Sequence, residues 1–444
     1  MNAEVRQIKT AAEQGLAGLF ADAKKHLPGE GQFAERRDKA FRRFEALGLP
    51  HRRVEEWKYT DLRALMRDAK PLAEPPGGAA IERAQAGGNL LADIDCRRLV
   101  FVDGSFVAAL SDVGNLELGL TIRPLSAALA EGDALAARYL GRLITLDDDA
   151  AYALNTAFMG DGAVIKVDAG AAVDRPIHLQ FLSSGDHSVS LFTRSLIVVE
   201  DGARAMFIES HEGGAQADNQ VNTALEMSVG DKAHVDHVKI NVEGPNVLHV
   251  STMITTVGAH ARLNTFNFTT GGAAVRNQLF LRFDGQGTVA GIRGATLIGG
   301  RQHVDTTLVA DHVAPNCQSR EIFKSVLDDE SRGVFQGKII VRPGAQKTDA
   351  KMMTRALLLS ENAEADNKPE LEIFADDVQC GHGATVGALD QDLLFYLRAR
   401  GIPAKEAQSL LVQAFVGEAV EGIEHAGLRE ALMEAVAAWL KARQ

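Results

Sequence analysis

The sequence contains little cysteine. Only Cys96, Cys317 and Cys380 occur among its 444 residues, and no two of them form a C-x-x-C pair. Three scattered cysteines cannot build a disulfide framework, and a chain of this length can stabilise itself through its hydrophobic core. The shortage therefore predicts a protein of a reducing compartment, and we expect it in the cytoplasm.

Basic residues and long apolar runs are also scarce. Lys and Arg total 47 against 59 Asp and Glu, which gives a formal net charge of −12. This charge argues against a general nucleic-acid binder, which needs clustered cations to neutralise phosphates. No run of 18 apolar residues is present, and the first residues do not read as the apolar core of a signal peptide. We expect neither a nucleic-acid partner nor a membrane partner.

The common catalytic motifs are missing. The segment 333–339 resembles a phosphate-binding loop, but three residues instead of four separate Gly333 from Gly337, and Ile339 stands where Mg²⁺ binding needs Ser or Thr. His211-Glu212 lacks the second histidine of a zinc-protease helix, and no G-x-S-x-G motif occurs. The sequence therefore predicts a protein that is not an enzyme.

The N-terminal part reads as mostly helical. Apolar residues at a spacing of three or four predict a helix from Val5 through Ile8 to Ala23, and a second helix that ends at Gly48. The acids 147–149 are expected to cap a helix that begins at residue 150 rather than to bind a cation. Residues 70–90 look like a linker, and 99–102 like a strand. We assign residues 1–160 to this region.

A weak repeat marks the middle of the chain. Glycines open successive blocks at steps of 32, 28, 28 and 27 residues, and each is followed by alternating apolar residues; they are Gly170, Gly202, Gly230, Gly258 and Gly285. A repeat of this length without helices predicts a β-solenoid, because a propeller blade needs about 40 residues. A β-sandwich stays open as an alternative. The predicted fold is mainly β, with residues 161–388 as its core.

Helical patterns return at the C-terminus. Asp390 is a plausible cap for a helix over 391–400. Two apolar stripes follow, one with Ala407, Leu410, Leu411, Ala414 and Phe415, the other with Leu428, Leu432, Ala435, Val436 and Trp439. They predict a helical hairpin within residues 389–444 that either caps the solenoid or docks a partner.

The segment Cys380-Gly381-His382 is the strongest candidate for chemistry. In an extended strand, positions i and i+2 project to the same face, and a thiolate beside an imidazole can ligate iron, zinc or copper. Two ligands do not close a metal site, so the others would come from elsewhere in the chain or from a partner. The alternative is a buried cysteine and a hydrogen-bonded histidine at a strand end. We take Cys317, His303 and His312, and the pair His234 and His237, as structural.

The region around Cys380 resembles the SufB/SufD family of iron–sulfur cluster assembly proteins. The resemblance covers most of the chain and is strong from about 320 to 420, where it includes 337–350, 389–402 and the segment 368–387 that holds Cys380 and His382. Glu55-Glu56-Trp57-Lys58-Tyr59-Thr60 and the Cys-x-His-Gly-Ala-Thr setting are similar to the SufD branch. This sequence has Gly381 where many members carry serine, which leaves the Cys-x-His spacing intact.

The resemblance implies a right-handed parallel β-helix between helical N- and C-terminal regions. It also implies a scaffold subunit that pairs with a SufB-like subunit through the β-helix and with a SufC-like ABC ATPase through the C-terminal helices. His382 would help to hold a nascent iron–sulfur cluster, transiently and together with a cysteine of SufB. Cys380 is the weaker candidate ligand, and no tightly bound cofactor is expected.

Two other functions remain open at this point. A β-helix can also belong to an enzyme that acts on acidic polysaccharide, or to a purely structural solenoid in which Cys380 and His382 are part of the core. An exposed sheet edge that normally meets SufB would pair with itself when the chain is alone, so we expect a homodimer in isolation.

Overall fold

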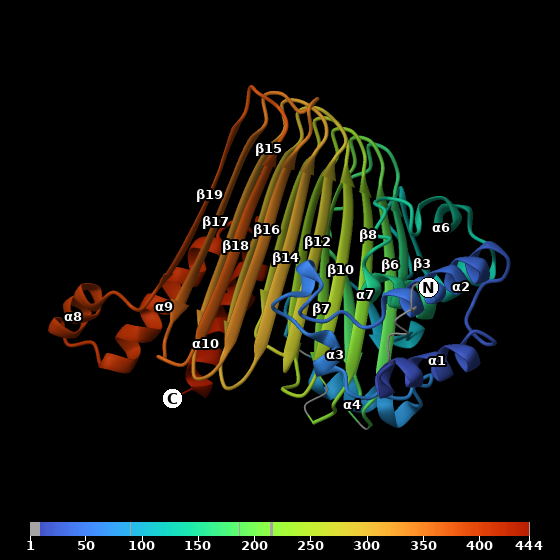
Figure 1. Cartoon of the computed structure of the whole chain (residues 1–444), viewed down its shortest axis with the longest axis horizontal. Helices are drawn as coiled ribbons and strands as arrows, with labels where there is room; N and C mark the ends of the chain where they lie inside the picture. The colour runs from blue at the N-terminus through green and yellow to red at the C-terminus, as the bar shows by residue number, and fades with distance from the viewer. Residues whose placement is uncertain (1–8, 89, 186, 214–215, 444) are drawn as a thin grey trace, which may run out of the picture.

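The centre of the molecule is a parallel β-helix, in which successive coils contribute strands to two facing sheets (Figure 1). The computed structural model describes residues 9–88, 90–185, 187–213 and 216–443. One sheet has ten strands, in the order β19 (Gln379–Gly387), β17 (Asp349–Leu358), β15 (Gln318–Leu327), β13 (Val289–Ile298), β11 (Arg262–Thr269), β9 (His234–Glu243), β7 (Arg204–Gly213), β5 (Ile177–Ser183), β1 (Arg97–Val102) and β2 (Ser105–Phe106). The other has nine, in the order β18 (Glu364–Ile373), β16 (Arg332–Val341), β14 (His303–His312), β12 (Ala274–Phe283), β10 (Leu248–Val257), β8 (Gln220–Val229), β6 (Ser190–Val199), β4 (Ala163–Val167) and β3 (Leu120–Pro124).

The coils stack in register, which builds one continuous core. Leu225 of β8 pairs with Met253 of β10, which pairs with Leu279 of β12, and all three are buried between the sheets. Because paired residues of parallel strands point to the same side, each inward position forms a ladder along the solenoid. The parallel two-sheet coil confirms the predicted solenoid, and the β-sandwich alternative is wrong.

The repeated glycines lie in the turns that follow the strands of the nine-stranded sheet. Gly230, Gly258 and Gly285 come directly or almost directly after β8, β10 and β12. A Cβ atom on Gly258 would lie 2.8 Å from the backbone nitrogen of Asp231 in the preceding coil, and one on Gly285 would lie 1.9 Å from that of Ala259. At these three positions the repeat records how closely consecutive turns stack, whereas Gly170 and Gly202 have room for a Cβ atom and adopt a positive φ instead.

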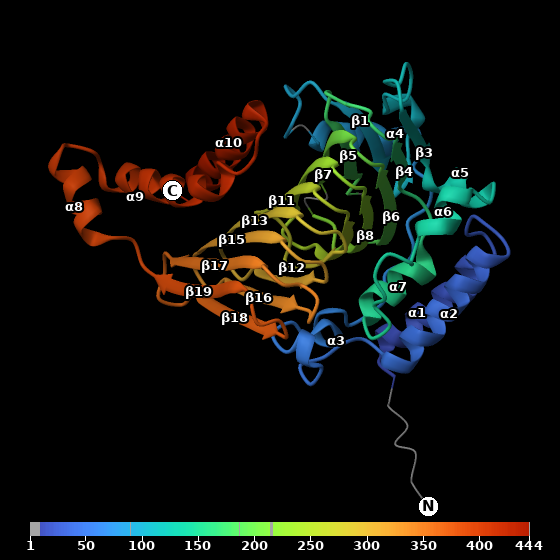
Figure 2. The ribbon, with the colours of Figure 1, turned by 90° about the horizontal axis from the view of Figure 1, so that it is seen from above.

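The N-terminal helices pack against the β-helix, most of them beside its first coils and α3 beside later ones (Figure 2). They are α1 (Ala11–Ala23), α2 (Gln32–Leu47), α3 (Leu62–Leu65), α4 (Gly78–Gly87), α5 (Leu125–Ala130), α6 (Ala134–Tyr139) and α7 (Ala150–Phe158), with the short 3-10 turns η1 (Glu55–Trp57) and η2 (Ala108–Leu110). Gly48 ends α2 at φ 71°, and the Asp149 side chain caps α7 by accepting from the Tyr152 N–H, as predicted.

One prediction for this region lies partly outside the described residues, and another is wrong in part. Val5 and Ile8, which we placed in the first helix, lie outside the described residues. The linker expected over 70–90 is wrong in part, because it contains α4 and because Leu72 bridges to Ser190 of β6. Its alanines gave it the low complexity of a linker, yet Ala84 is buried against β1.

The C-terminal helices are α8 (Gln391–Ala399), α9 (Ala404–Val420) and α10 (Ala426–Ala442). Helices α9 and α10 lie along the outer face of the ten-stranded sheet, whereas α8 projects away from it (Figure 2). The predicted stripe of α10 is confirmed, with Leu428, Leu432 and Val436 buried. That of α9 is wrong in part: Ala407 is buried but Leu410 is 43% exposed, and the buried face continues through Val412, Val416 and Val420. Helix α9 has two apolar faces, and packing against the sheet determines which of them is buried. No described helix is long and apolar enough to cross a membrane.

Candidate functional site at the last coil

Cys380 and His382 lie on β19, the last strand of the ten-stranded sheet. Cys380 pairs with Ala350 of β17, and His382 pairs with Met352. Ala350 and Met352 are buried in the core between the two sheets. Since residues paired in parallel strands share a face, Cys380 and His382 both point to the inner side of the solenoid. This agrees with the expectation that Cys380 and His382, two positions apart in an extended strand, project to the same face.

The inner side is open at this end of the solenoid. In the described chain β18 and β19 are terminal strands of their sheets, so no further coil covers them. His382 is consequently exposed and Cys380 is half-buried. Apolar side chains surround this edge: Phe374, Val386 and Ile373 are 59%, 50% and 41% exposed. An uncovered strand with apolar neighbours is typical of a surface that pairs with another chain.

The electrostatic setting keeps the Cys380 thiol protonated. Burial raises the pKa of this thiol, and the carboxylates of Asp349 and Glu321 raise it further. The thiolate is the form that ligates metal, so a metal ion bound by Cys380 would have to displace this proton.

Glu321 lies deeper in the same inward ladder, and the sequence analysis missed it. The ladder runs from Ile292 through Glu321 and Met352 to His382. Glu321 is fully buried, and neither carboxylate oxygen has a hydrogen-bond partner among the described residues. Burial raises the pKa of this carboxyl to about 7. Only the stacking register, which single-sequence periodicity does not supply, could have identified Glu321 as inward-facing.

The other cysteines and histidines near the open end have structural partners. The Cys317 thiol donates to the carbonyl oxygen of Gly285 at 3.3 Å, and Nε2 of His312 lies 3.1 Å from the Ser319 hydroxyl oxygen. His312 also stacks on Phe283 with ring centroids 4.3 Å apart. These contacts agree with the structural role expected for both residues.

The pair His234 and His237 is split between two faces of β9. His237 points inward, with its Nδ1 3.0 Å from the Thr265 hydroxyl oxygen. His234 is partly exposed, with its Nε2 3.6 Å from a carboxylate oxygen of Asp236. The two histidines therefore form no shared metal site.

The segment Glu55–Thr60 docks on the outer face of the nine-stranded sheet. The Arg276 guanidinium of β12 lies 4.0 Å from the centre of the buried Trp57 ring, and its Nη2 donates to the Glu56 carbonyl oxygen at 2.7 Å. The Thr60 hydroxyl donates to the Asp305 carboxylate of β14 at 2.5 Å. The segment is thus an anchor for the N-terminal region and not part of the site at the last coil.

Comparison with known proteins gives two matches that together span most of the chain. A family model described as "SUF system FeS cluster assembly, SufBD core domain" matches residues 181–415, and one described as "SufBD protein N-terminal region" matches residues 10–179. The boundary between the two matched regions, at residue 180, falls within β5 of the ten-stranded sheet.

Individual relatives agree with these matches. An iron–sulfur cluster assembly SufBD family protein of Synechocystis is 33% identical over 404 residues, covering 88% of this chain and 87% of that protein. The iron–sulfur cluster assembly protein SufD of Escherichia coli is 31% identical over 389 residues, with 87% and 88% covered. The SufD protein of Bacillus subtilis is 25% identical over 314 residues, with 70% and 72% covered.

Proposed function

Because this chain belongs to the SufBD family of iron–sulfur cluster assembly proteins, we propose that it is the SufD-like scaffold subunit of a SufBCD-type complex. The observation that carries the proposal is the position of Cys380 and His382 on the inner face of the last, uncovered strand. An imidazole and a thiol are too few ligands to hold a cluster alone. A nascent cluster, as transient cargo, would take its remaining ligands from a partner at this edge.

The partner proposed for this edge is a SufB-like subunit. The edge strands β18 and β19 offer backbone N–H and C=O groups to a further strand, and Ile373, Phe374 and Val386 add apolar area. A strand from SufB paired here would bring its own side chains beside His382. In the absence of SufB, the same edge would support the homodimer.

The ATPase partner is proposed to bind at the C-terminal helices. Leu393, Phe395 and Tyr396 of α8 are 51%, 73% and 51% exposed, on a helix that projects from the body. Three large apolar side chains exposed on one short helix favour contact with another protein. The sequence has no phosphate-binding loop, so ATP hydrolysis would take place in a SufC-like subunit, and this chain would act without catalysis of its own.

Family membership favours the scaffold over the two alternatives left open by the sequence. An enzyme acting on acidic polysaccharide would need a cleft lined with catalytic and basic groups along the solenoid, and nothing in the matched families suggests that activity. A purely structural solenoid would not require a histidine on an uncovered inner face. With three reduced cysteines and the partners named, we place the complex in the cytoplasm.

The test is anaerobic cluster assembly on the complete complex. The wild-type chain, His382→Ala, Cys380→Ser and the control Gln379→Ala are each co-purified with SufB- and SufC-like partners and supplied with ferrous iron and a sulfide source. Gln379 lies on the same strand, is exposed, and points to the opposite face from Cys380. Cluster formation is followed by visible absorption and circular dichroism, and transfer by activation of an apo-ferredoxin.

We expect His382→Ala to reduce assembly at least tenfold, Cys380→Ser to have a smaller effect, and Gln379→Ala to match the wild type. All variants should co-purify with both partners, since each change removes only one side chain from the edge. Normal assembly with His382→Ala would refute the ligand role. If the wild-type chain does not co-purify with the two partners, the proposed complex is refuted.

A further inference from the structure

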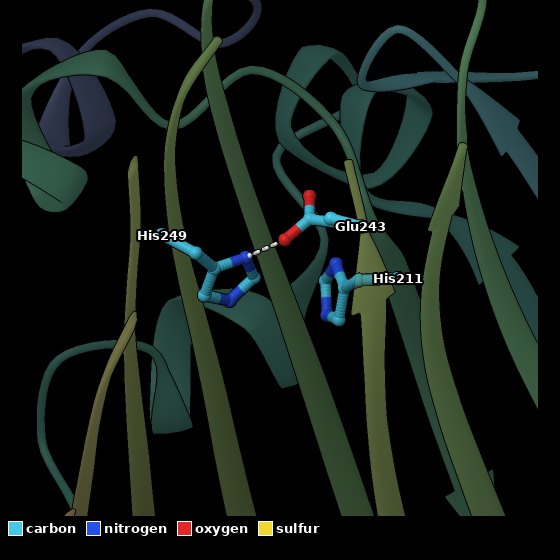
Figure 3. A group of neighbouring side chains, drawn as sticks. All are labelled: His211, Glu243 and His249. Atoms are coloured by element: carbon cyan, nitrogen blue, oxygen red, sulfur yellow. Dashed lines mark hydrogen bonds and ion pairs between the residues drawn. The ribbon is translucent and has the colours of Figure 1, made fainter. Parts of the chain in front are cut away.

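A second group of metal-ligating side chains is buried inside the middle coils, away from the last coil. His211 lies on β7, Glu243 at the end of β9 and His249 near the start of β10 (Figure 3). Their exposed fractions are 2%, 8% and 0%. One ligand atom from each lies within 4.8 Å of those of the other two. The group thus joins two neighbouring strands of one sheet to a strand of the facing sheet.

The two histidine rings and the carboxylate converge on one point. Nδ1 of His249 lies 2.6 Å from Oε2 of Glu243, and the rings of His211 and His249 meet edge to face with centroids 4.7 Å apart (Figure 3). Phe181 stacks on the other face of His211 at a centroid distance of 4.8 Å and an interplanar angle of 6°. The packing therefore fixes the direction in which the His211 ring nitrogens point.

Hydrogen bonds from neighbouring side chains orient these groups in the manner seen around metal ligands. Nε2 of His211 lies 2.6 Å from Oε1 of Glu209, so this nitrogen donates its proton to the carboxylate and Nδ1 carries the free lone pair. The Asn241 amide donates to Oε2 of Glu243 at 2.9 Å. A carboxylate that holds the far nitrogen of a histidine is a common second layer around a bound metal ion.

Lys239 supplies the only ammonium among the described residues that contact this group. Its Nζ donates to Nε2 of His249 at 3.2 Å, and also to the side chains of Ser251 and Asn277. One ammonium faces two carboxylates, Glu209 and Glu243, so the buried group has a net negative charge when its histidines are neutral. Uncompensated charge is costly inside a protein, and a bound cation removes that cost.

We propose that His211, Glu243 and His249 bind one divalent transition-metal ion inside the β-helix. Two imidazoles and one carboxylate are a ligand set suited to Fe²⁺ and Zn²⁺. On binding, the metal takes the Nδ1 lone pair of His249: the Nδ1 proton leaves to solvent, and Nε2 takes a proton from the Lys239 ammonium, so that His249 stays a neutral imidazole and Lys239 becomes an amine. The ion is resident: it ties β7 and β9 to β10, and it is separate from the transient cluster proposed at Cys380 and His382.

Cobalt binding by the full chain tests this site. The background is the double variant Cys380→Ser/His382→Ala, which removes the ligands at the last coil. Metal-free protein is titrated anaerobically with Co²⁺ and followed by visible absorption and equilibrium dialysis. Glu243→Gln is compared with His312→Gln, a control that changes another buried, inward-facing histidine.

We expect the double variant to bind one Co²⁺ per chain. Glu243→Gln added to it should weaken binding at least tenfold, while His312→Gln should leave it unchanged. In the double variant, bound Co²⁺ should also shift the ring resonances of His211 and His249 and spare those of His312. Absence of Co²⁺ binding by the double variant, or unshifted His211 and His249 resonances, would overturn the proposal even where Glu243→Gln does not fold.

Discussion

The buried carboxyl of Glu321 makes the stability of the β-helix depend on pH in a way that one substitution can isolate. Glu321 is fully buried in the ladder that leads to His382, and its oxygens have no hydrogen-bond partner in the described part of the chain. Glu321→Gln keeps the size of the side chain and removes its charge at every pH. The comparison therefore separates the cost of ionisation from the cost of packing.

The size and sign of the effect follow from the pKa. Burial raises the pKa of Glu321 from 4.5 to about 7 in the folded protein. Below the unfolded value of 4.5 the carboxyl is neutral in both states and has no effect on the pH dependence. As the pH rises from 4.5 to about 7 only the unfolded state releases the proton, so stability is lost over this window. A difference of about 2.5 pH units at about 1.4 kcal/mol each corresponds to roughly 3 kcal/mol.

The assay is urea or thermal unfolding of wild type and Glu321→Gln from pH 4.5 to 8.5. The difference between the two proteins is the quantity of interest, because all other titrating groups are common to both. We expect the free energy of unfolding of the wild type to fall relative to that of the variant by roughly 3 kcal/mol as the pH rises, and to level off above about pH 7.5. An unsatisfied glutamine amide shifts the variant curve by a constant amount and does not change its slope.

Glu372→Gln on β18 provides a control, since it removes an exposed carboxylate whose pairing with Lys338 lies at the surface. Its pH profile should follow the wild type. Parallel profiles for wild type and Glu321→Gln across the whole range would show that Glu321 ionises normally. In that case the reasoning that connects its burial to the raised pKa would be wrong.

Three further predictions concern packing and assembly. Trp57→Ala removes a buried ring that packs on Arg276; it should cost about 3–5 kcal/mol and speed hydrogen exchange over residues 48–66, and unchanged exchange would refute the anchor role. Gly258→Ala places a Cβ 2.8 Å from the Asp231 nitrogen; calorimetry should show a loss of about 1–3 kcal/mol, whereas Gly344→Ala, with 3.7 Å to its nearest neighbour, should be tolerated. Val386→Lys should convert the expected homodimer to monomer in light scattering, and a monomeric wild type would contradict that expectation.

The solenoid could be predicted because the glycines of its turns recur along the sequence at nearly constant steps. Each repeated glycine lies where a turn passes over the turn of the preceding coil, and Gly258 and Gly285 leave no room for a side chain there. The helix ends were predictable for a similar reason, since Asp149 and Asp390 satisfy backbone N–H groups within three residues of themselves. Local interactions of this kind are visible in a single sequence.

The buried polar groups could not be predicted, because they depend on which residues meet between coils and between sheets. His211 and Glu243 are 32 positions apart in the sequence, and Glu243 and His249 lie on opposite sheets. Periodicity assigns each residue to a face of its own strand but does not say what lies across the core. The predicted face of α9 was wrong in part for the same reason: both of its stripes are apolar, and contact with β13 and β15 selects one.

The two sites differ in access because of where they lie along the stack. An inward residue of any middle coil is covered on both sides by its neighbours in the ladder, as Met253 is by Leu225 and Leu279. A metal ion held there by His211, Glu243 and His249 would exchange slowly and stay with the chain. At the last coil of the described chain the inward positions are uncovered, so a ligand at His382 would remain accessible until a partner covers it. The two proposed sites, one resident and one transient, therefore differ because they lie in the middle and at the end of the same stack of coils.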